Sequence, residues 1–218
     1  MEKSVMNEYK VQTFPVGPLQ CNCTIITNTL EKSALIIDPG GDPDKILGLL
    51  AQDQISKVKV IHTHAHFDHF MASGTIKART GANLALHKED KLLWDHLEDQ
   101  CRMFGIPYNP VPDPDSWLEH EEDLCIGTHN CGKALHTPGH TPGSMSFLFQ
   151  DLNLLIAGDT LFKGGIGRTD LWGGDYAAIE KSIKSVIYQL DEAYDVVTGH
   201  GPATTIGEEM RNNPFIRA

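Results

Sequence analysis

The segment from Thr63 to His69 has the residue types for metal chemistry. It reads Thr-His-Ala-His-Phe-Asp-His, so three imidazoles and one carboxylate lie within six residues. Each neutral imidazole needs both ring nitrogens satisfied, and a buried carboxylate needs a positive partner. A divalent zinc, iron or manganese ion satisfies all of them, because imidazole and carboxylate groups are suitable ligands for such ions. The segment therefore predicts a metal site.

The spacing within this segment indicates two ion positions. Residues two apart on an extended chain face the same side, so His64 and His66 can hold one ion. The chain is then expected to enter a helix, so that Asp68 and His69 point toward a second position beside the first. Four side chains do not complete two metal sites, so further ligands must come from elsewhere.

Three later residues are candidates for the missing ligands, and each lies at the end of a predicted strand. His140 lies in a tight loop between two strands, Asp159 follows an apolar strand, and His200 follows the last strand. Flanking glycines let the backbone and an ion approach closely there. Asp38 also ends a buried strand, and it either orients a ligand histidine or is a simple turn aspartate.

The elements that must position these residues follow from apolar runs and helix boundaries. Strands are expected over residues 23–27, 34–38, 58–61, 83–86, 133–136, 144–149, 154–157 and 195–198. Helices are expected over residues 43–51, 67–80, 88–104 and 175–190, with an irregular proline-rich loop over 106–115. Because several strands come in hairpin-like succession, the pattern favours two packed sheets with helices outside over one doubly wound sheet.

The order HxHxDH, His, Asp, His resembles the metallo-β-lactamase superfamily. The strings at 137–144, 162–170 and 199–202 are similar to its single-domain, glyoxalase-II-like branch, and the similarity runs from about residue 21 to 215. The resemblance implies an α+β fold, namely an αββα sandwich of two mixed β-sheets with helices on the outer faces. It also implies that the site lies along one edge of the sandwich.

The resemblance assigns a role to each candidate ligand. The implied ligands are His64, His66 and His140 for the first metal, and Asp68, His69 and His200 for the second. Asp159 would bridge the metals together with a water or hydroxide. Asp68 and Asp159 are therefore the implied catalytic residues, since two cations lower the pKa of a bridging water toward neutrality. Zinc is the expected metal of both sites, and iron or manganese would use the same ligands.

The expected reaction is hydrolysis of thioesters such as hydroxyacylglutathione by a metal-bridging hydroxide, while one metal polarises the carbonyl. The alternative is an iron-dependent persulfide dioxygenase of the same superfamily, because the Gly-Arg-Thr-Asp string at 167–170 is similar to that of such enzymes. A non-catalytic metal-binding domain is a third, weaker hypothesis, since a complete ligand set keeps water at the metals.

Two basic side chains close to Asp159 in the sequence are candidates for substrate binding. Lys163 and Arg168 lie on a glycine-rich loop just past this aspartate. They could bind the carboxylate of an anionic thioester, with Arg168 in bidentate fashion. The alternative is that both are solvated loop charges.

Composition limits the remaining possibilities. A formal net charge of −11 disfavours nucleic acid as a partner. No apolar run approaches the ~20 residues that a membrane helix needs, and no signal core follows the N-terminus, so a cytoplasmic protein is expected. We expect one domain over residues 1–218, without the C-terminal helical domain by which full-length glyoxalase II enzymes bind glutathione. The sequence says nothing about oligomeric state.

The remaining cysteines and histidines are expected to be structural. Five widely spaced cysteines without a CxxC pair indicate reduced, mostly buried thiols. His62 falls on the opposite pleat face from Thr63 and is expected to be a buried, hydrogen-bonded histidine. Solvated or structural roles are expected for His87, His96, His120, His129 and His136.

Overall fold

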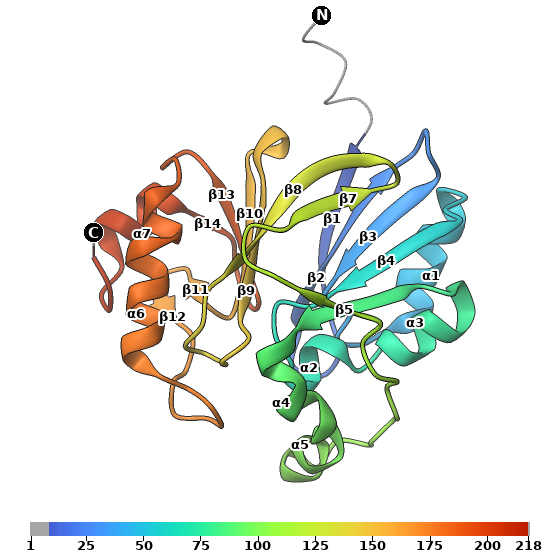
Figure 1. Cartoon of the computed structure of the whole chain (residues 1–218), viewed down its shortest axis with the longest axis horizontal. Helices are drawn as coiled ribbons and strands as arrows, with labels where there is room; N and C mark the ends of the chain where they lie inside the picture. The colour runs from blue at the N-terminus through green and yellow to red at the C-terminus, as the bar shows by residue number, and fades with distance from the viewer. Residues whose placement is uncertain (1–8, 218) are drawn as a thin grey trace, which may run out of the picture.

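A mixed six-stranded sheet forms the first half of the molecule in the computed structural model, which describes residues 9–217 (Figure 1). Its strands follow chain order: β1 (Tyr9–Val16), β2 (Cys21–Asn28), β3 (Ser33–Ile37), β4 (Lys57–Ile61), β5 (Asn83–His87) and β6 (Ser116–Leu118). The first three strands pair antiparallel, and β3 to β6 pair parallel.

A second mixed sheet of six strands packs against the first. Its strand order is β14-β13-β10-β9-β8-β7, and only β10 and β13 pair parallel. The bounds are β7 (Asp123–Ile126), β8 (His129–His136), β9 (Met145–Phe149), β10 (Leu154–Gly158), β13 (Asp195–Thr198) and β14 (Thr204–Thr205). A separate hairpin joins β11 (Leu161–Phe162) and β12 (Gly165–Ile166).

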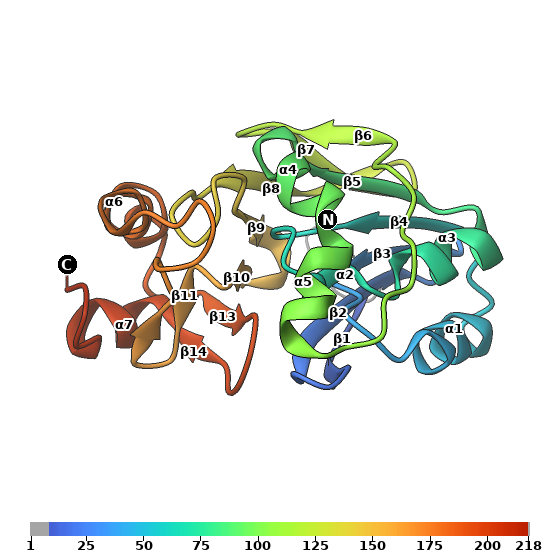
Figure 2. The ribbon, with the colours of Figure 1, turned by 90° about the horizontal axis from the view of Figure 1, so that it is seen from below.

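Helices cover the outer face of each sheet (Figures 1 and 2). Those beside the first sheet are α1 (Pro43–Gln52), α2 (Phe67–Phe70), α3 (Ser73–Thr80), α4 (Lys91–Asp95) and α5 (Leu97–Phe104). Those beside the second are α6 (Tyr176–Ser185) and α7 (Ile206–Asn212). Short 3₁₀ turns within residues 9–217 are η2 (Lys88–Asp90), η3 (Gln150–Leu152) and η4 (Ile187–Gln189).

Side-chain alternation along the strands produces three apolar layers. In β2, Ile25 packs toward the helices while Ile26 packs between the sheets. In β9, Phe147 and Phe149 pack between the sheets while Leu148 packs toward α6. Successive residues of a strand face opposite sides, so each strand contributes to two layers. The expected αββα sandwich of two mixed sheets is confirmed.

The single helix expected over residues 67–80 is wrong, because the chain breaks it into α2 and α3. The backbone N–H of Ala72 donates to the carbonyl oxygen of Pro39 at 3.0 Å. Gly40 lies so close that a Cβ there would be 1.5 Å from the carbonyl oxygen of Asp68. The loop after β3 thus packs directly on the bend, and the short α2 is left to present Asp68 and His69.

Other boundaries also differ from expectation. The helix expected over 88–104 is η2, α4 and α5, with His96 between the last two, and the one over 175–190 is α6 followed by η4. Strands β1, β6, β7, β11, β12 and β14 and helix α7 were not predicted. Strand β1 lies at the edge of its sheet, and its residues are half-buried or exposed except for the buried Val16, so the strand has no apolar run to reveal it.

The expectation for the cysteines is confirmed within residues 9–217: all five are free, and four are buried, with Cys125 exposed. In the same residues, every helix is too short or too polar to cross a membrane.

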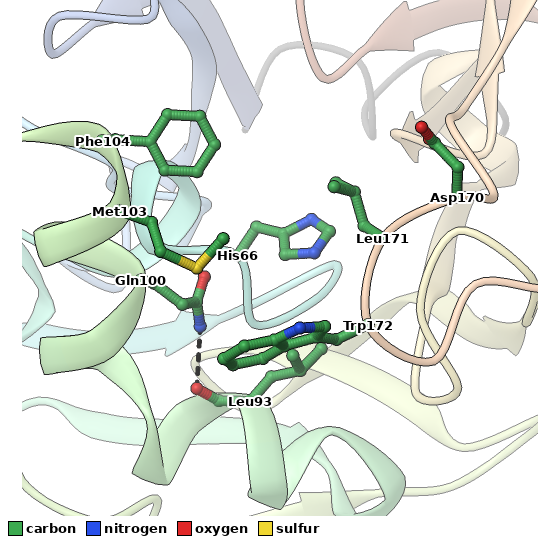
Figure 3. Close-up of a pocket in the computed structure, with 8 residues that line it drawn as sticks. All are labelled: His66, Leu93, Gln100, Met103, Phe104, Asp170, Leu171 and Trp172. Carbon is green, nitrogen blue, oxygen red and sulfur yellow. Dashed lines mark hydrogen bonds between the residues drawn. The ribbon is translucent and has the colours of Figure 1, made fainter.

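Two segments distant in sequence face each other at one end of the sandwich (Figure 3). Leu93 of α4 and Met103 and Phe104 of α5 lie opposite Leu171 and Trp172, which belong to the loop between β12 and α6. His66 lies between the two segments. The first-sheet half and the second-sheet half therefore meet beside the predicted metal ligands.

Candidate metal centre

The seven predicted ligands come together at the edge where several strands end. His64 and His66 follow β4, and Asp68 and His69 lie on α2. The loops that follow β8, β10 and β13 carry the other three ligands, His140, Asp159 and His200. Ligands from both sheets thus converge between them, although the sequence separates the first from the last by more than half of the chain.

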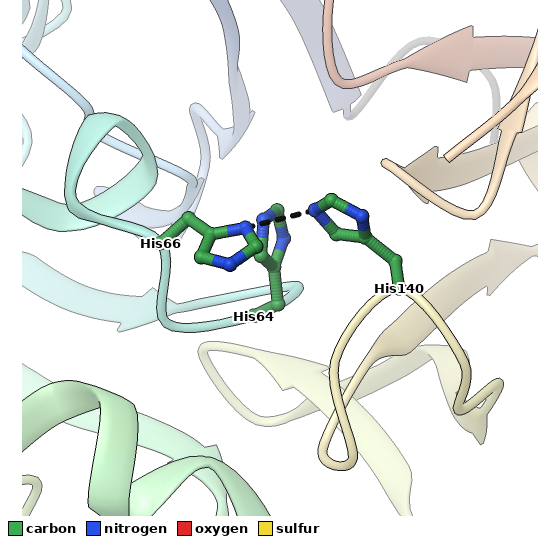
Figure 4. A group of neighbouring side chains, drawn as sticks. All are labelled: His64, His66 and His140. Carbon is green, nitrogen blue, oxygen red and sulfur yellow. Dashed lines mark hydrogen bonds between the residues drawn. The ribbon is translucent and has the colours of Figure 1, made fainter. Parts of the chain in front are cut away.

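The first triad consists of three histidines (Figure 4). The Nδ1 atom of His66 lies 2.8 Å from the Nε2 atom of His140. One nitrogen from each of His64, His66 and His140 lies within 4.8 Å of the other two. Three nitrogens so close together can bind one ion.

The second triad combines a carboxylate with two histidines. The Nε2 atom of His200 lies 3.1 Å from the Oδ2 atom of Asp68 and 3.3 Å from the Nε2 atom of His69. These three ligand atoms also fall within 4.8 Å of one another.

Asp159 lies between the triads. Its Oδ1 atom is 3.4 Å from Nε2 of His69, and its Oδ2 atom is 3.6 Å from Nε2 of His140. The Oδ1 atom and Nε2 of His64 are buried and have no hydrogen-bond partner among residues 9–217. Buried polar atoms of native proteins are rarely left unpaired. The orphaned atoms and the two triads make the cluster suited to a dinuclear metal site.

Hydrogen bonds outside the cluster select which ring nitrogen of each histidine faces inward. The Nδ1 atoms of His69, His140 and His200 contact Asp38 Oδ2, the Arg168 carbonyl and the Leu19 carbonyl at 3.0, 2.8 and 3.0 Å. A carbonyl or carboxylate oxygen only accepts, so each Nδ1 donates its proton. In the neutral form of each ring, Nε2 is therefore the nitrogen whose lone pair faces a metal, as in known metal sites.

Asp38 supports ligands of both triads. It accepts from the backbone N–H of Thr63 at 2.7 Å, from the Thr63 hydroxyl at 2.6 Å and from His69 Nδ1 at 3.0 Å. Because the Thr63 hydroxyl donates to Asp38, it accepts from His64 Nδ1 at 3.0 Å. The orienting contact expected of Asp38 is therefore present, and it extends through Thr63 to a second histidine.

Asp90 joins the two halves of the cluster, and sequence reasoning missed it. This buried carboxylate accepts from the backbone N–H of Ala65 at 2.9 Å, the hydroxyl of Thr141 at 2.8 Å and the backbone N–H of Gly143 at 2.6 Å. It thereby ties the loop of His64 and His66 to the loop of His140. No motif marks Asp90, because its partners are mostly backbone groups far along the chain.

The pKa shifts suit a metal at His64, His66 and Asp68. At His69 and His200, in contrast, neighbouring charged groups outweigh burial and raise the pKa, so a metal would displace a proton from each of these two rings. Burial, reinforced by neighbouring imidazoles, lowers the pKa of His64 well below its usual value and that of His66 to about 3. Burial acts to raise the pKa of Asp68, but His69 and His200 outweigh it and bring this pKa to about 2. Unprotonated imidazole and carboxylate are the forms that bind metal ions.

A cavity of about 270 Å³ opens beside both triads. His66, Asp68, His140, Asp159 and His200 line it. Its other walls include Leu19, Phe162, Ile166, Leu171 and the predicted substrate-binding residue Arg168. The Arg168 guanidinium donates to both oxygens of Asp170, at 2.9 and 3.0 Å. Lys163 is exposed and is not among the residues that line the cavity.

The remaining histidines have structural contacts. His62 is fully buried, bonded to the Ala85 carbonyl at 2.9 Å and the Ser73 hydroxyl at 2.8 Å, as expected. His87 and His136 stack with ring centroids 4.1 Å apart beside Glu89, a grouping that the sequence did not reveal. His136 Nε2 contacts the Pro142 carbonyl at 2.9 Å, and His87 caps η2. His96 bonds the Leu92 carbonyl, while His120 and His129 are exposed.

Comparison with known proteins agrees with this geometry. The Haemophilus influenzae protein "Hydroxyacylglutathione hydrolase GloC" is 35% identical over 209 residues, which cover 95% of this chain and 98% of that protein. The crystal structure of BLEG-1, a B3 metallo-β-lactamase, superposes with a TM-score of 0.87 at 38% identity, covering 96% of this chain and all of that one. TTHA1623, solved in a di-iron-bound form, has a TM-score of 0.84 at 33% identity, covering 93% of this chain and 98% of that one.

The profile described as "Metallo-beta-lactamase superfamily" matches residues 16–200, a range that contains all seven clustered ligand candidates. The αββα sandwich, the paired triads at its edge and these similarities lead to one conclusion: the chain belongs to the metallo-β-lactamase superfamily of metal-dependent hydrolases.

Proposed function

We propose that this chain is a dinuclear metal-dependent hydrolase of thioesters such as hydroxyacylglutathione. The observation that carries the proposal is the position of Asp159, whose two oxygens face His69 of one triad and His140 of the other. A carboxylate in that position can bridge two ions. The proposed ligands are the first triad, the second triad and Asp159, with Asp68 and Asp159 as the residues on which catalysis depends.

Two bound cations, proposed to be zinc, would supply an activated water at neutral pH and polarise the scissile carbonyl. The chain's own residues prepare for this. Asp38, the Arg168 carbonyl and the Leu19 carbonyl hold the Nδ1 protons, so the inward nitrogens stay available. Burial of His64 keeps its imidazole neutral, and Phe67 and Leu171 add apolar wall to the cavity beside the ligands.

The substrate class is proposed from the cavity and from GloC. GloC is matched over 98% of its own length, so the activity in its name belongs to a chain of similar extent. A thioester has a good leaving group and needs no general acid to protonate it. Apart from the metal-ligand candidates, the residues that line the cavity include no acid that could protonate a poorer leaving group. The proposed substrate is a small anionic thioester, with Arg168 at the cavity rim as the contact for its carboxylate.

The test is hydrolysis of S-lactoylglutathione by the metal-analysed protein, with dissolved oxygen followed in the same vessel. We expect thiol release without oxygen consumption. The alternative is an iron-dependent persulfide dioxygenase, since the similar TTHA1623 is described with two irons and the same ligand types hold iron. Oxygen uptake with glutathione persulfide and no thioester turnover would establish that alternative. A β-lactam should be included because BLEG-1 is described as a B3 metallo-β-lactamase.

A further inference from the structure

A second cavity, of about 200 Å³, continues the metal cavity past His66 (Figure 3). The two cavities share four lining residues: His66, Gln100, Phe104 and Leu171. A group attached to a carbonyl at the metal cluster can therefore extend directly into this second cavity, which we name the apolar annex.

The lining of the annex is apolar. Leu93, Met103, Phe104, Leu171 and Trp172 form most of its wall. Met103, Phe104 and Trp172 are 65%, 51% and 51% exposed, which is unusual for large apolar side chains that are close together. Grouped exposed apolar residues beside a reactive centre indicate a place for an apolar ligand group.

The polar residues of the annex are already engaged. Both N–H groups of the Gln100 amide donate, to the carbonyls of Ala65 and Leu93, at 3.0 and 2.8 Å. Asp170 accepts both bonds from Arg168. A polar substrate group entering the annex would lose water and find few free partners, whereas an apolar group loses only unfavourable hydration.

Two ring contacts hold the annex walls in position. The rings of Phe104 and Phe67 lie 4.9 Å apart, and Trp172 meets His96 edge-to-face at 6.2 Å. The walls come from α4 and α5 on one side and from the loop after β12 on the other. A cavity of about 150 Å³ lined by apolar side chains takes a benzene molecule, so the annex has room for a ring or a short chain.

We infer that the annex binds an apolar substituent of the thioester, a short alkyl chain or an aryl ring on either the acyl or the thiol side of the scissile bond. This inference rests on the proposed thioester hydrolysis. It defines a substrate class with an apolar arm beside the reacting carbonyl.

The experiment uses two series of neutral thioesters with the metal-loaded protein. One series lengthens the acyl chain from acetyl to octanoyl on N-acetylcysteamine, and the other lengthens the alkanethiol of an acetyl thioester. In the series that reaches the annex, kcat/KM should rise about three- to fourfold per added methylene until the cavity is filled. Flat profiles in both series would overturn the inference.

Variants locate the effect. Trp172→Ala and Leu93→Ala should lower the long-to-short ratio of kcat/KM about tenfold, whereas Trp117→Ala, on β6, should leave it unchanged. Trp172 is half-exposed, so its variant should fold even if Leu93→Ala does not. A chain-length preference that Trp172→Ala leaves intact would place the apolar site elsewhere and overturn the inference.

Failure of the proposed function is distinguishable from failure of the annex. If no thioester is turned over, calorimetry of S-alkyl glutathione thioethers, from methyl to hexyl, still measures binding to the metal-loaded protein. Affinity that rises with chain length and falls in Trp172→Ala would support the annex alone. Affinity independent of chain length would overturn it.

Discussion

The two halves of the molecule contribute to the metal centre in different ways. The first-sheet half supplies His64, His66, Asp68 and His69 from one stretch of six residues, braced by Asp38. The second-sheet half supplies His140, Asp159 and His200 from three separate strand-end loops. Its two histidines bond only backbone carbonyls through Nδ1.

From this difference we expect the first half to be organised without a metal and the ligand loops of the second half to depend more on one. The buried carboxylate of Asp38 fixes ligands of the first half. The ligand loops of the second half meet these ligands across the boundary between the two sheets. Asp90 is one of the protein's own links between the two halves. Bonds from Asn22 to Gly199 and from His200 to Leu19 are others. Bound metals would add to these links, since each triad has ligands from both halves.

The largest expected effect comes from removing the carboxylate that serves both triads. Asp159→Ala should lower kcat/KM for S-lactoylglutathione about a thousandfold, and Asp68→Ala, which affects one triad, about a hundredfold. Metal analysis should find less metal in Asp159→Ala than in Asp68→Ala. Two metals and near-normal turnover in Asp159→Ala would contradict a bridging role.

Removal of the metals should loosen the second half more than the first. Exhaustive chelation should lower Tm by about 5–10 °C, as expected for losing a ligand held well above its Kd in a chain of this length. Hydrogen exchange should quicken more at residues 138–144 and 199–202 than at residues 57–61. Added zinc should restore both the Tm and the slower hydrogen exchange. An equal increase of the exchange rate in the two halves would contradict a greater metal dependence of the second half.

Asp90→Ala should weaken one of the protein's own links between the two halves, the one that joins the His64 loop to the His140 loop. The change leaves the buried N–H groups of Ala65 and Gly143 without an acceptor, which should cost about 2–4 kcal/mol in the free energy of unfolding. Metal affinity should fall about tenfold or more, because the two ligand loops are no longer held together. Urea denaturation and zinc titration measure these effects. The exposed Asp151→Ala is the control, and equal behaviour of both variants would remove Asp90 from this role.

Acid should destabilise the first half of the metal-free protein through His62. Burial lowers its pKa from 6.5 to about 4, so the unfolded chain binds its proton first. The contribution of His62 to stability is therefore fully present above pH 6.5 and is lost as pH falls toward 4, by up to about 3 kcal/mol, in addition to the losses from His64 and His66, whose pKa values are also lowered. Urea denaturation from pH 7 to 4 measures the loss. A plot of the free energy of unfolding against pH has a slope that reports the protons taken up on unfolding. His62→Gln should lower that number by up to one, and an unchanged slope would contradict the role of His62.

The smallest expected effect concerns Arg168 on the second half. Its guanidinium is exposed and already paired with Asp170, so it can contribute little to binding. Arg168→Ala should raise KM for an anionic thioester about threefold and leave kcat unchanged. Lys163→Ala, outside the cavity lining, should change neither, and a neutral thioester should be indifferent to both changes. An equal loss with neutral and anionic substrates would mean that Arg168 only supports its loop.

The sequence alone determined the types and the order of the ligand candidates. The HxHxDH segment is local, and His140, Asp159 and His200 each follow a predicted strand and lie near glycines. The sequence also marked Asp38, at the end of a predicted strand, as a residue that could orient a ligand histidine. The αββα arrangement followed from strand succession together with the resemblance. Each of these features rests on neighbours along the chain, which is the information that a single sequence holds.

Only the tertiary structure decided which of these groups meet and what surrounds them. The 2.8 Å approach of His66 to His140 and the position of Asp159 depend on how two sheets pack. The acceptors at Leu19 and Arg168 are backbone carbonyls, which every residue has and no motif marks. The broken helix before Ser73 and the annex walls likewise arise from contacts between distant segments. Such contacts depend on packing in three dimensions, and no local pattern of residues encodes them.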